Sequence, residues 1–119
     1  MFYYQLNFVV RQDKFDEFID ALYSLSKGIQ NEHACHEVGL YRDLQKRDDY
    51  RFHVEWKTRQ AMEGHFKREQ FSVLIGAAKV LGEDFEMSIG ETLEKGSYQF
   101  AQEKISLDPG KDKMLDTKS

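Results

Sequence analysis

The stretch YRFHVEWKTRQAMEGHFKREQFSVLIGAAKVL, residues 50–81, decides the fold of this chain. Its first residues are strand-like up to Trp56, with aromatic and β-branched side chains. After a polar turn, apolar residues recur at helical spacing as far as Leu81, and Gly82 predicts the end of the helix. His65 lies on the apolar side of this helix, so we expect the Trp56 and His65 rings to converge on one pocket.

The rest of the chain adds three strands and a helix. Residues 2–10 predict a strand, and residues 15–29 carry apolar side chains three and four apart, which predicts an amphipathic helix. Residues 35–44 and 50–57 predict a hairpin, and residues 85–93 alternate as a last strand. The order strand, helix, strand, strand, helix, strand is that of the ferredoxin-like α+β fold.

The charges of the hairpin predict its register. Two opposite-charge cross-strand pairs, each worth about 0.2–1 kcal/mol, coincide with two apolar pairs in one alignment. The expected pairs are Asp43–Arg51, Glu37–Lys57, Leu40–Val54 and Val38–Trp56. The sheet face away from the helices then carries Gln5, Asn7, Tyr41, His53 and Glu55. Such a face can be solvated, or it can pack on a second copy about a two-fold axis.

Length and composition limit the classes of protein to which this chain can belong. The 119 residues suffice for one domain, expected over residues 1–94, with an arm and a polar tail over residues 95–119. We expect that arm to lie on the domain or on a partner copy. The net charge of −4 argues against a nucleic-acid partner, which needs a basic surface. No apolar run is long enough to cross a membrane, and no signal peptide is recognisable.

The single cysteine, Cys35, excludes a disulfide within the chain and favours a reducing compartment, so we expect a cytoplasmic protein. His33, Cys35 and His36 are close in sequence, as metal ligands often are. Strand alternation, however, sends Cys35 and His36 to opposite faces, and no second cysteine or carboxylate stands at ligand spacing. No metal site is therefore expected.

Part of the chain resembles the antibiotic biosynthesis monooxygenase family. The family's pattern E-W … A … H-F … F is similar to a series of residues in this chain: Glu55-Trp56, then Ala61, His65-Phe66 and Phe71. Residues 39–43 resemble its second strand, and the likeness extends over about residues 2–94. It implies a dimeric α+β barrel, in which two ferredoxin-like sheets pack face to face and the partner is a second copy of the chain.

Members of this family include cofactor-free oxygenases of quinol-like aromatics, an isomerase and haem-degrading enzymes. The haem-degrading branch resembles this chain least, because Leu6 stands where that branch has an asparagine, and Asn7 is one residue out of register. The chain has no flavin, nicotinamide or haem motif, so no cofactor is expected.

Three residues are candidates for catalysis. His65 is a candidate general base, since an unperturbed imidazole pKa of about 6.5 suits proton removal from a phenol or enol. Trp56 can form a wall against a flat substrate, and Arg42, expected on the same face, can hold an oxyanion. Each has a structural alternative: a histidine bonded to the backbone, a core tryptophan and an arginine that reaches solvent.

Four aromatic residues are candidates for substrate binding, with core packing as their alternative: Tyr4, Phe8, Phe52 and Phe66. The first functional hypothesis is a homodimeric, cofactor-independent monooxygenase of a small aromatic or quinol-like substrate. The alternatives are a non-catalytic small-molecule-binding or structural dimer, and an isomerase of a small hydroxyketone.

Overall fold

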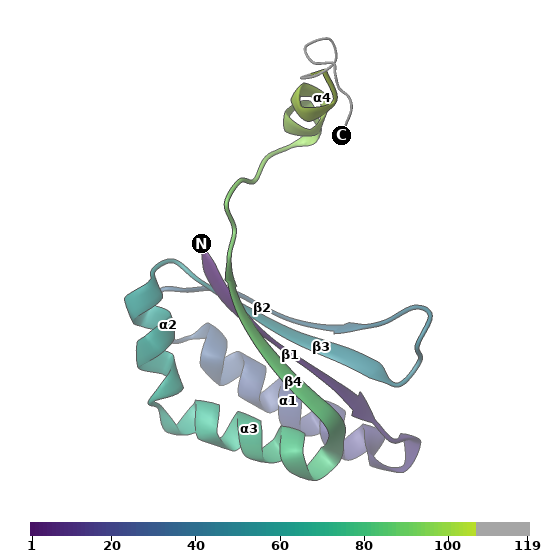
Figure 1. The fold of residues 1–119 in the computed structure, drawn as a ribbon. Coiled ribbons are helices and arrows are strands. Elements are labelled where there is room, and N and C mark those ends of the chain that lie inside the picture. Colours follow the sequence, from purple (N-terminus) through teal and green to yellow (C-terminus); the bar gives the residue numbers. More distant parts are fainter. Residues whose placement is uncertain (107–119) are drawn as a thin grey trace.

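The computed structural model describes residues 1–106 and consists of a four-stranded antiparallel sheet with helices packed on one face (Figure 1). The elements are β1 (Phe2–Val10), a short 3-10 turn (Gln12–Lys14), α1 (Phe15–Gln30), β2 (Cys35–Arg42), β3 (Asp49–Trp56), α2 (Arg59–Phe66), α3 (Glu69–Leu81), β4 (Gly82–Glu91) and α4 (Tyr98–Ser106). The strands lie in the order β2-β3-β1-β4. This is the ferredoxin-like arrangement, so the predicted fold is confirmed.

The helix predicted after Trp56 is divided in two. Thr58 caps α2, because its side chain accepts a hydrogen bond of 3.1 Å from the backbone N–H of Ala61. The helix ends at Phe66, and α3 begins at Glu69 after two residues that are in neither helix. The break places α2 across one end of the sheet and α3 along its length (Figure 1).

The hairpin register differs from the prediction by two residues. Glu37 lies opposite Glu55, and Arg42 lies opposite Tyr50 rather than Phe52. From Val38 to Arg42, a shift of two residues keeps each side chain on its predicted face, so the apolar pattern does not distinguish the two registers. The predicted register was wrong because Asp43 stabilises the turn instead of pairing across the strands. Its carboxylate accepts hydrogen bonds from the backbone N–H groups of Gln45 and Lys46 at 2.7 and 2.9 Å.

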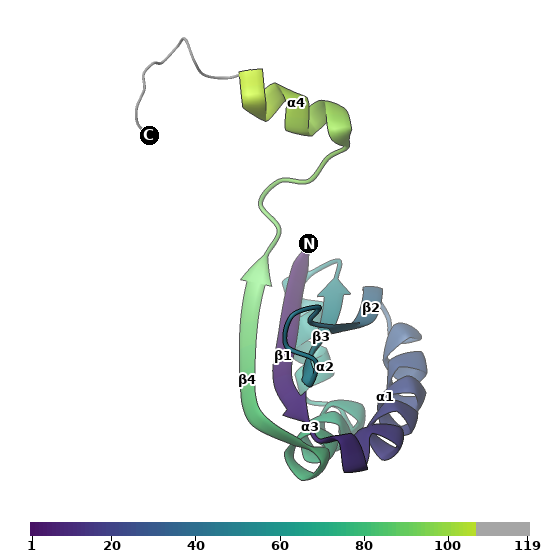
Figure 2. The same cartoon turned by 90° about the vertical axis from the view of Figure 1, so that its right-hand side faces the viewer.

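The core lies between the sheet and the helices. The buried side chains of the two central strands alternate along each strand and are Tyr4, Leu6, Phe8, Val10, Tyr50, Phe52, Val54 and Trp56. The helices cover them with Phe18, Leu22, Ile29, Met62 and Leu74. Burial of each large apolar side chain contributes about 1.5–3 kcal/mol, so this face dominates the stability of the domain. The opposite face is left uncovered by helices (Figure 2).

The carboxyl-terminal arm contains a helix that the sequence did not predict. After β4, an extended segment leads to α4, which stands away from the sheet and from the other helices (Figure 2). Tyr98 and Ile105 on α4 are each 79% exposed, so within this protomer the arm does not lie on the domain. Leu107 and the polar tail fall outside the described residues. Across residues 1–106, no helix combines the length and apolar character needed to span a bilayer.

Candidate functional site

His65 occupies the end of the core where α2 crosses the sheet. Its ring lies 4.7 Å from the Trp56 ring and stacks against Tyr4 at 5.4 Å between centroids. All three side chains are buried, His65 being 1% exposed. Trp56 and Tyr4 reach this point because both are on the helix-facing side of neighbouring strands, with Tyr4 opposite Val54 and Trp56 two residues further.

Both nitrogens of the His65 ring have side-chain partners. Nδ1 lies 3.1 Å from both carboxylate oxygens of Glu32, and Nε2 lies 2.7 Å from the hydroxyl oxygen of Tyr4. An ionised carboxylate can only accept, so Nδ1 carries the hydrogen. Nε2 is then an acceptor, and the Tyr4 hydroxyl donates to it. The result is a directed chain of hydrogen bonds from Tyr4 through His65 to Glu32.

Glu32 is fixed by two further residues. Its side chain is only 6% exposed, and the amide of Gln70 donates to Oε2 at 3.0 Å. The guanidinium of Arg68, itself largely exposed, lies 3.5 Å from Oε1. These donors hold the carboxylate in place close to the core, where it orients the imidazole.

Burial and charge act in opposite directions at this site. Burial lowers the pKa of His65 below its ordinary value, while the charge and hydrogen bond of Glu32 raise it and Arg68 lowers it. The pKa of Tyr4 is raised, first by burial and then by the negative charge of Glu32. The same two causes raise the pKa of the Cys35 thiol to about 11. His65 is therefore a neutral base with a carboxylate placed to stabilise its protonated form.

An aromatic wall surrounds the imidazole. Phe66 and Phe71 meet Tyr4 edge-on at 5.4 and 5.6 Å, and lie 4.9 Å from each other. Trp56 adds a polar group to this wall, because its indole Nε1 is buried without a hydrogen-bond partner in residues 1–106. Buried donors are usually paired, so this unpaired N–H beside an aromatic surface can donate a hydrogen bond to an acceptor atom of a ligand.

Comparison with known proteins assigns the chain to a family. The model of the antibiotic biosynthesis monooxygenase family matches residues 1–76. The chain belongs to this family. The resemblance seen in the sequence is therefore confirmed. A comparison with curated proteins gave no significant match.

Solved structures show the same fold as this family member. A candidate antibiotic biosynthesis monooxygenase from Deinococcus radiodurans has a TM-score of 0.74 and 17% identity, over 82% of this chain and 97% of the other. A conserved protein from Methanosarcina mazei has a TM-score of 0.70 and 20% identity, over 76% and 91%. A variant of SnoaB, a cofactor-independent oxygenase from Streptomyces nogalater, has a TM-score of 0.70 and 15% identity, over 79% and 94%.

Within this antibiotic biosynthesis monooxygenase family member, the predicted site residues divide into two groups. His65, Trp56, Tyr4 and Phe66 come together, as described above. Arg42 is exposed near the opposite end of the sheet, where it lines an open cleft of about 560 Å³ together with residues of all four strands. An oxyanion held by Arg42 would therefore not lie beside the His65 ring.

Phe8 and Phe52 are also separate from the imidazole. Phe8 packs against Phe18 with ring centroids 5.1 Å apart, and it contributes to the cleft that contains Arg42. Phe52 is fully buried, and it borders a smaller groove of about 240 Å³ between α1 and the β2–β3 hairpin. Both residues pack in the core at these positions.

Two residues that complete the site were missed in the sequence. Glu32 follows α1, in a polar segment that predicted only the end of a helix, and Gln70 is on the first turn of α3. Neither position has a local pattern that indicates a buried contact. Their meeting with His65 depends on the packing of α1 against α3, which the sequence alone does not specify.

Proposed function

We propose that this protein is a cofactor-independent monooxygenase that acts on a small aromatic, quinol-like substrate. The observation that carries the proposal is the chain of hydrogen bonds Tyr4–His65–Glu32 inside an aromatic wall. It provides a base, an orienting carboxylate and flat surfaces for a ring. Membership of the antibiotic biosynthesis monooxygenase family supports the same reaction class, and SnoaB, with the same fold, is a cofactor-independent oxygenase.

The first step is proton removal from the substrate hydroxyl. The substrate donates its proton to the oxygen of Tyr4, while the hydroxyl proton of Tyr4 moves to Nε2 of His65. Glu32, which holds the Nδ1 hydrogen, stabilises the imidazolium that forms. The unpaired indole N–H of Trp56 donates a hydrogen bond to the oxyanion left on the substrate.

The second step needs only oxygen as co-reactant. The substrate anion is electron-rich and transfers electrons to O₂. In the enol form of an anthrone-type substrate, the hydroxyl proton passes to His65 in the first step, and the ring CH opposite the oxyanion becomes a carbonyl in the second. One oxygen atom of O₂ enters the product, and the other leaves as water with the hydrogen of that carbon and the proton that His65 returns. All the electrons that reduce O₂ come from the substrate.

Substrate entry requires a rearrangement of side chains. Tyr4 and His65 are buried, and Phe66 and Phe71 lie over Tyr4. These two phenylalanines flank the break between α2 and α3, where Lys67 and Arg68 are not in either helix. A small movement at this break opens the aromatic wall without unfolding a helix.

The same proposal includes a homodimer. Helices cover one face of the sheet only, and on the other face Glu55 and His53 have side chains just 13% and 20% exposed although no helix lies over them. A second copy packed against this face would form the α+β barrel implied by the family resemblance. Light scattering on the purified protein should give a mass of two subunits, and a mass of one subunit would contradict the dimer.

The activity test measures oxygen consumption without any added cofactor. Wild type should oxidise at least one anthrone-type or quinol compound, and ¹⁸O₂ should place one labelled atom in the product. His65→Gln and Glu32→Gln should each lower kcat by about 100-fold or more, because base catalysis contributes 10²–10⁴-fold. His33→Gln is the matched control, since His33 is exposed before β2 and should leave the rate unchanged. Equal rates for wild type and His65→Gln would disprove the assigned base.

Two other functions remain testable in the same assay. The complete burial of His65 favours a small-molecule-binding or structural dimer, for which ligands bind and no substrate turns over. The acid–base pair also suits isomerisation of a small hydroxyketone, since that reaction moves a proton without an oxidant. Turnover that persists under nitrogen would identify the isomerase.

A further inference from the structure

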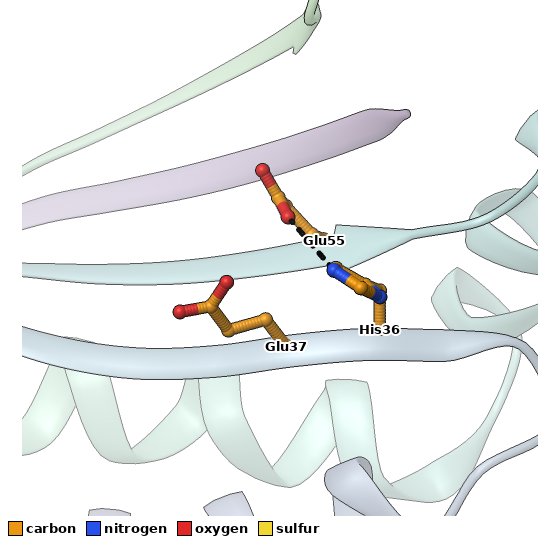
Figure 3. A group of neighbouring side chains, drawn as sticks. All are labelled: His36, Glu37 and Glu55. Carbon is orange, nitrogen blue, oxygen red and sulfur yellow. Dashed lines mark ion pairs between the residues drawn. The ribbon is translucent and has the colours of Figure 1, made fainter. Parts of the chain in front are cut away.

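A second group of histidines and glutamates lies on the sheet face away from the helices, which is also the face that would meet the second copy in the proposed dimer. It consists of His36 and Glu37 on β2 with Glu55 and His53 on β3. Figure 3 shows the first three, with the His36 ring directed toward the Glu55 carboxylate and Glu37 beside them. One ligand-type atom from each of His36, Glu37 and Glu55 lies within 4.8 Å of the others. None of the four residues contacts the Tyr4–His65–Glu32 chain, which is on the helix-covered face.

A β-bulge brings His36 and Glu37 to the same face. Cys35 pairs with Trp56 and Glu37 pairs with Glu55, so β2 has one extra residue, His36, between two consecutive pairs. A bulge of this kind re-aims a side chain that strict alternation would send to the other face. Strict alternation would place His36 and Glu37 on opposite faces, so the sequence did not predict that the two side chains share one.

The cluster has more negative charge than its hydrogen bonds satisfy. Glu37 is directly opposite Glu55, and like charges in this position are destabilising. Within residues 1–106, Oε1 of Glu55 is buried and has no hydrogen-bond partner, and Nε2 of His36 lies 4.0 Å from it. Oε2 is 3.7 Å from Nε2 of His53. A bound cation would balance both carboxylates at once.

We propose that His36, Glu37, Glu55 and His53 bind a divalent cation of the Zn²⁺ class. Zn²⁺ takes four nitrogen and oxygen ligands at about 2.0–2.2 Å, so the side chains need to close by roughly an ångström or two around it. Two imidazoles select Zn²⁺ over Mg²⁺ and Ca²⁺, which prefer oxygen ligands.

The hydrogen bonds of His53 prepare it as a ligand. Nδ1 of His53 lies 3.0 Å from Oε1 of Gln5, a carbonyl oxygen that can only accept, so Nδ1 carries the hydrogen. The lone pair is then on Nε2, the nitrogen that faces Glu55. Metal-ligating histidines characteristically donate their other N–H to such a partner, which fixes the ring orientation. Contact with the Tyr3 ring, which is tilted by 33° with centroids 4.9 Å apart, holds the ring further.

Calorimetric titration of the purified chain with ZnCl₂, and with MgCl₂ for comparison, tests the proposal. Wild type should bind Zn²⁺ and not Mg²⁺. Glu55→Gln and His36→Gln should each weaken Zn²⁺ binding by about 100-fold or more, since even outer-shell partners account for 10–100-fold. His33→Gln, an exposed histidine outside the cluster, should bind as wild type does. Co²⁺ in place of Zn²⁺ should give visible absorption bands of a site with nitrogen and oxygen ligands.

Thermal unfolding distinguishes a variant that has lost the metal site from one that has lost the fold. Zn²⁺ should raise the Tm of wild type, because it binds only the folded site. Glu55→Gln removes the repulsion with Glu37, so without metal its Tm should equal or exceed that of wild type, yet Zn²⁺ should no longer raise it. If millimolar Zn²⁺ neither binds nor stabilises wild type, or if all variants bind equally, the cluster is only a network of ion pairs and the proposal is wrong.

Discussion

The two faces of the sheet use the same residue types in opposite ways. On the helix-covered face, Glu32 and His65 form a closed set of hydrogen bonds in which each polar atom of the pair has a partner. On the uncovered face, Glu55 has similar histidine neighbours at 3.7 and 4.0 Å, and one of its oxygens is buried without a hydrogen bond.

The two clusters differ in whether all their polar atoms have hydrogen-bond partners. A buried polar network with all partners present is rigid and holds a single tautomer, as a catalytic base requires. A cluster with two facing carboxylates and an unsatisfied oxygen is destabilising until a cation is added. The helix-covered face is therefore organised for proton transfer, and the face that would meet the second copy for binding a cation.

The largest expected effect is on stability, and it comes from removing the Trp56 ring from the aromatic wall. Trp56 is fully buried against His65, and Trp56→Ala leaves a large cavity in the core. We expect a loss of about 3–5 kcal/mol in the free energy of unfolding, measured by urea denaturation. Val80→Ala, at an exposed position on α3, should change it by less than about 0.5 kcal/mol. A similar small loss for Trp56→Ala would show that the wall is not part of the core.

The same substitution at two glutamates compares the faces directly. Glu32→Gln keeps the shape of the side chain but removes the charge that accepts from His65, Gln70 and Arg68. Charge-assisted hydrogen bonds contribute about 1.5–3 kcal/mol, so we expect a loss of that size. Glu55→Gln should be neutral or stabilising in metal-free buffer, because it removes a like-charge pair. Equal losses at both positions would remove the distinction between the two clusters.

Tyr4→Phe tests the last link of the covered network. The substitution keeps the ring that packs on Phe66 and Phe71, and it removes only the hydroxyl that donates to Nε2 of His65. A single neutral hydrogen bond contributes about 1 kcal/mol to stability, so the folded state should persist. Turnover should fall much more than stability, since Tyr4 carries the proton in the proposed mechanism. A variant that loses stability but retains kcat would assign Tyr4 a structural role only.

The sequence predicted the covered face better than the uncovered one. Alternation on β1 and β3 placed Tyr4 and Trp56 toward the helices, and helical spacing placed His65 toward the sheet, so the meeting of these rings followed from local periodicity. Glu32 and Gln70 lacked any such pattern. They reach His65 through the packing of helices that are far apart in sequence, and no periodicity reports such a contact.

The uncovered face depended on details of register. The predicted hairpin set Glu37 against Lys57, whereas the structure sets it against Glu55, and the bulge at His36 turns one more ligand toward the cluster. Asp43 had two possible partners, Arg51 across the strands and the N–H groups of its own turn, and the local one prevailed. A difference of two residues in one strand pair thus converts two expected ion pairs into a candidate metal site.

The smallest expected effect is on the pH dependence of the unfolding free energy, and it comes from the buried imidazole of His65. Burial lowers the pKa of His65, so below about pH 6.5 the unfolded chain binds a proton at this residue that the folded chain resists. The contribution of His65 to stability is therefore complete above that pH and is lost as the pH falls toward the lowered value. Between about pH 7.5 and 5.5, wild type should lose more unfolding free energy than His65→Gln.

The control for this comparison is Val80→Ala, which removes no ionisable group from an exposed position on α3 and should keep the wild-type pH slope. Titration of the His65 imidazole signal by NMR checks the cause, since it should change at a pH below the ordinary imidazole value of about 6.5. If the His65 signal changes at that ordinary value instead, water reaches the ring despite its burial, and the closed network that distinguishes the two faces of the sheet does not exist in solution.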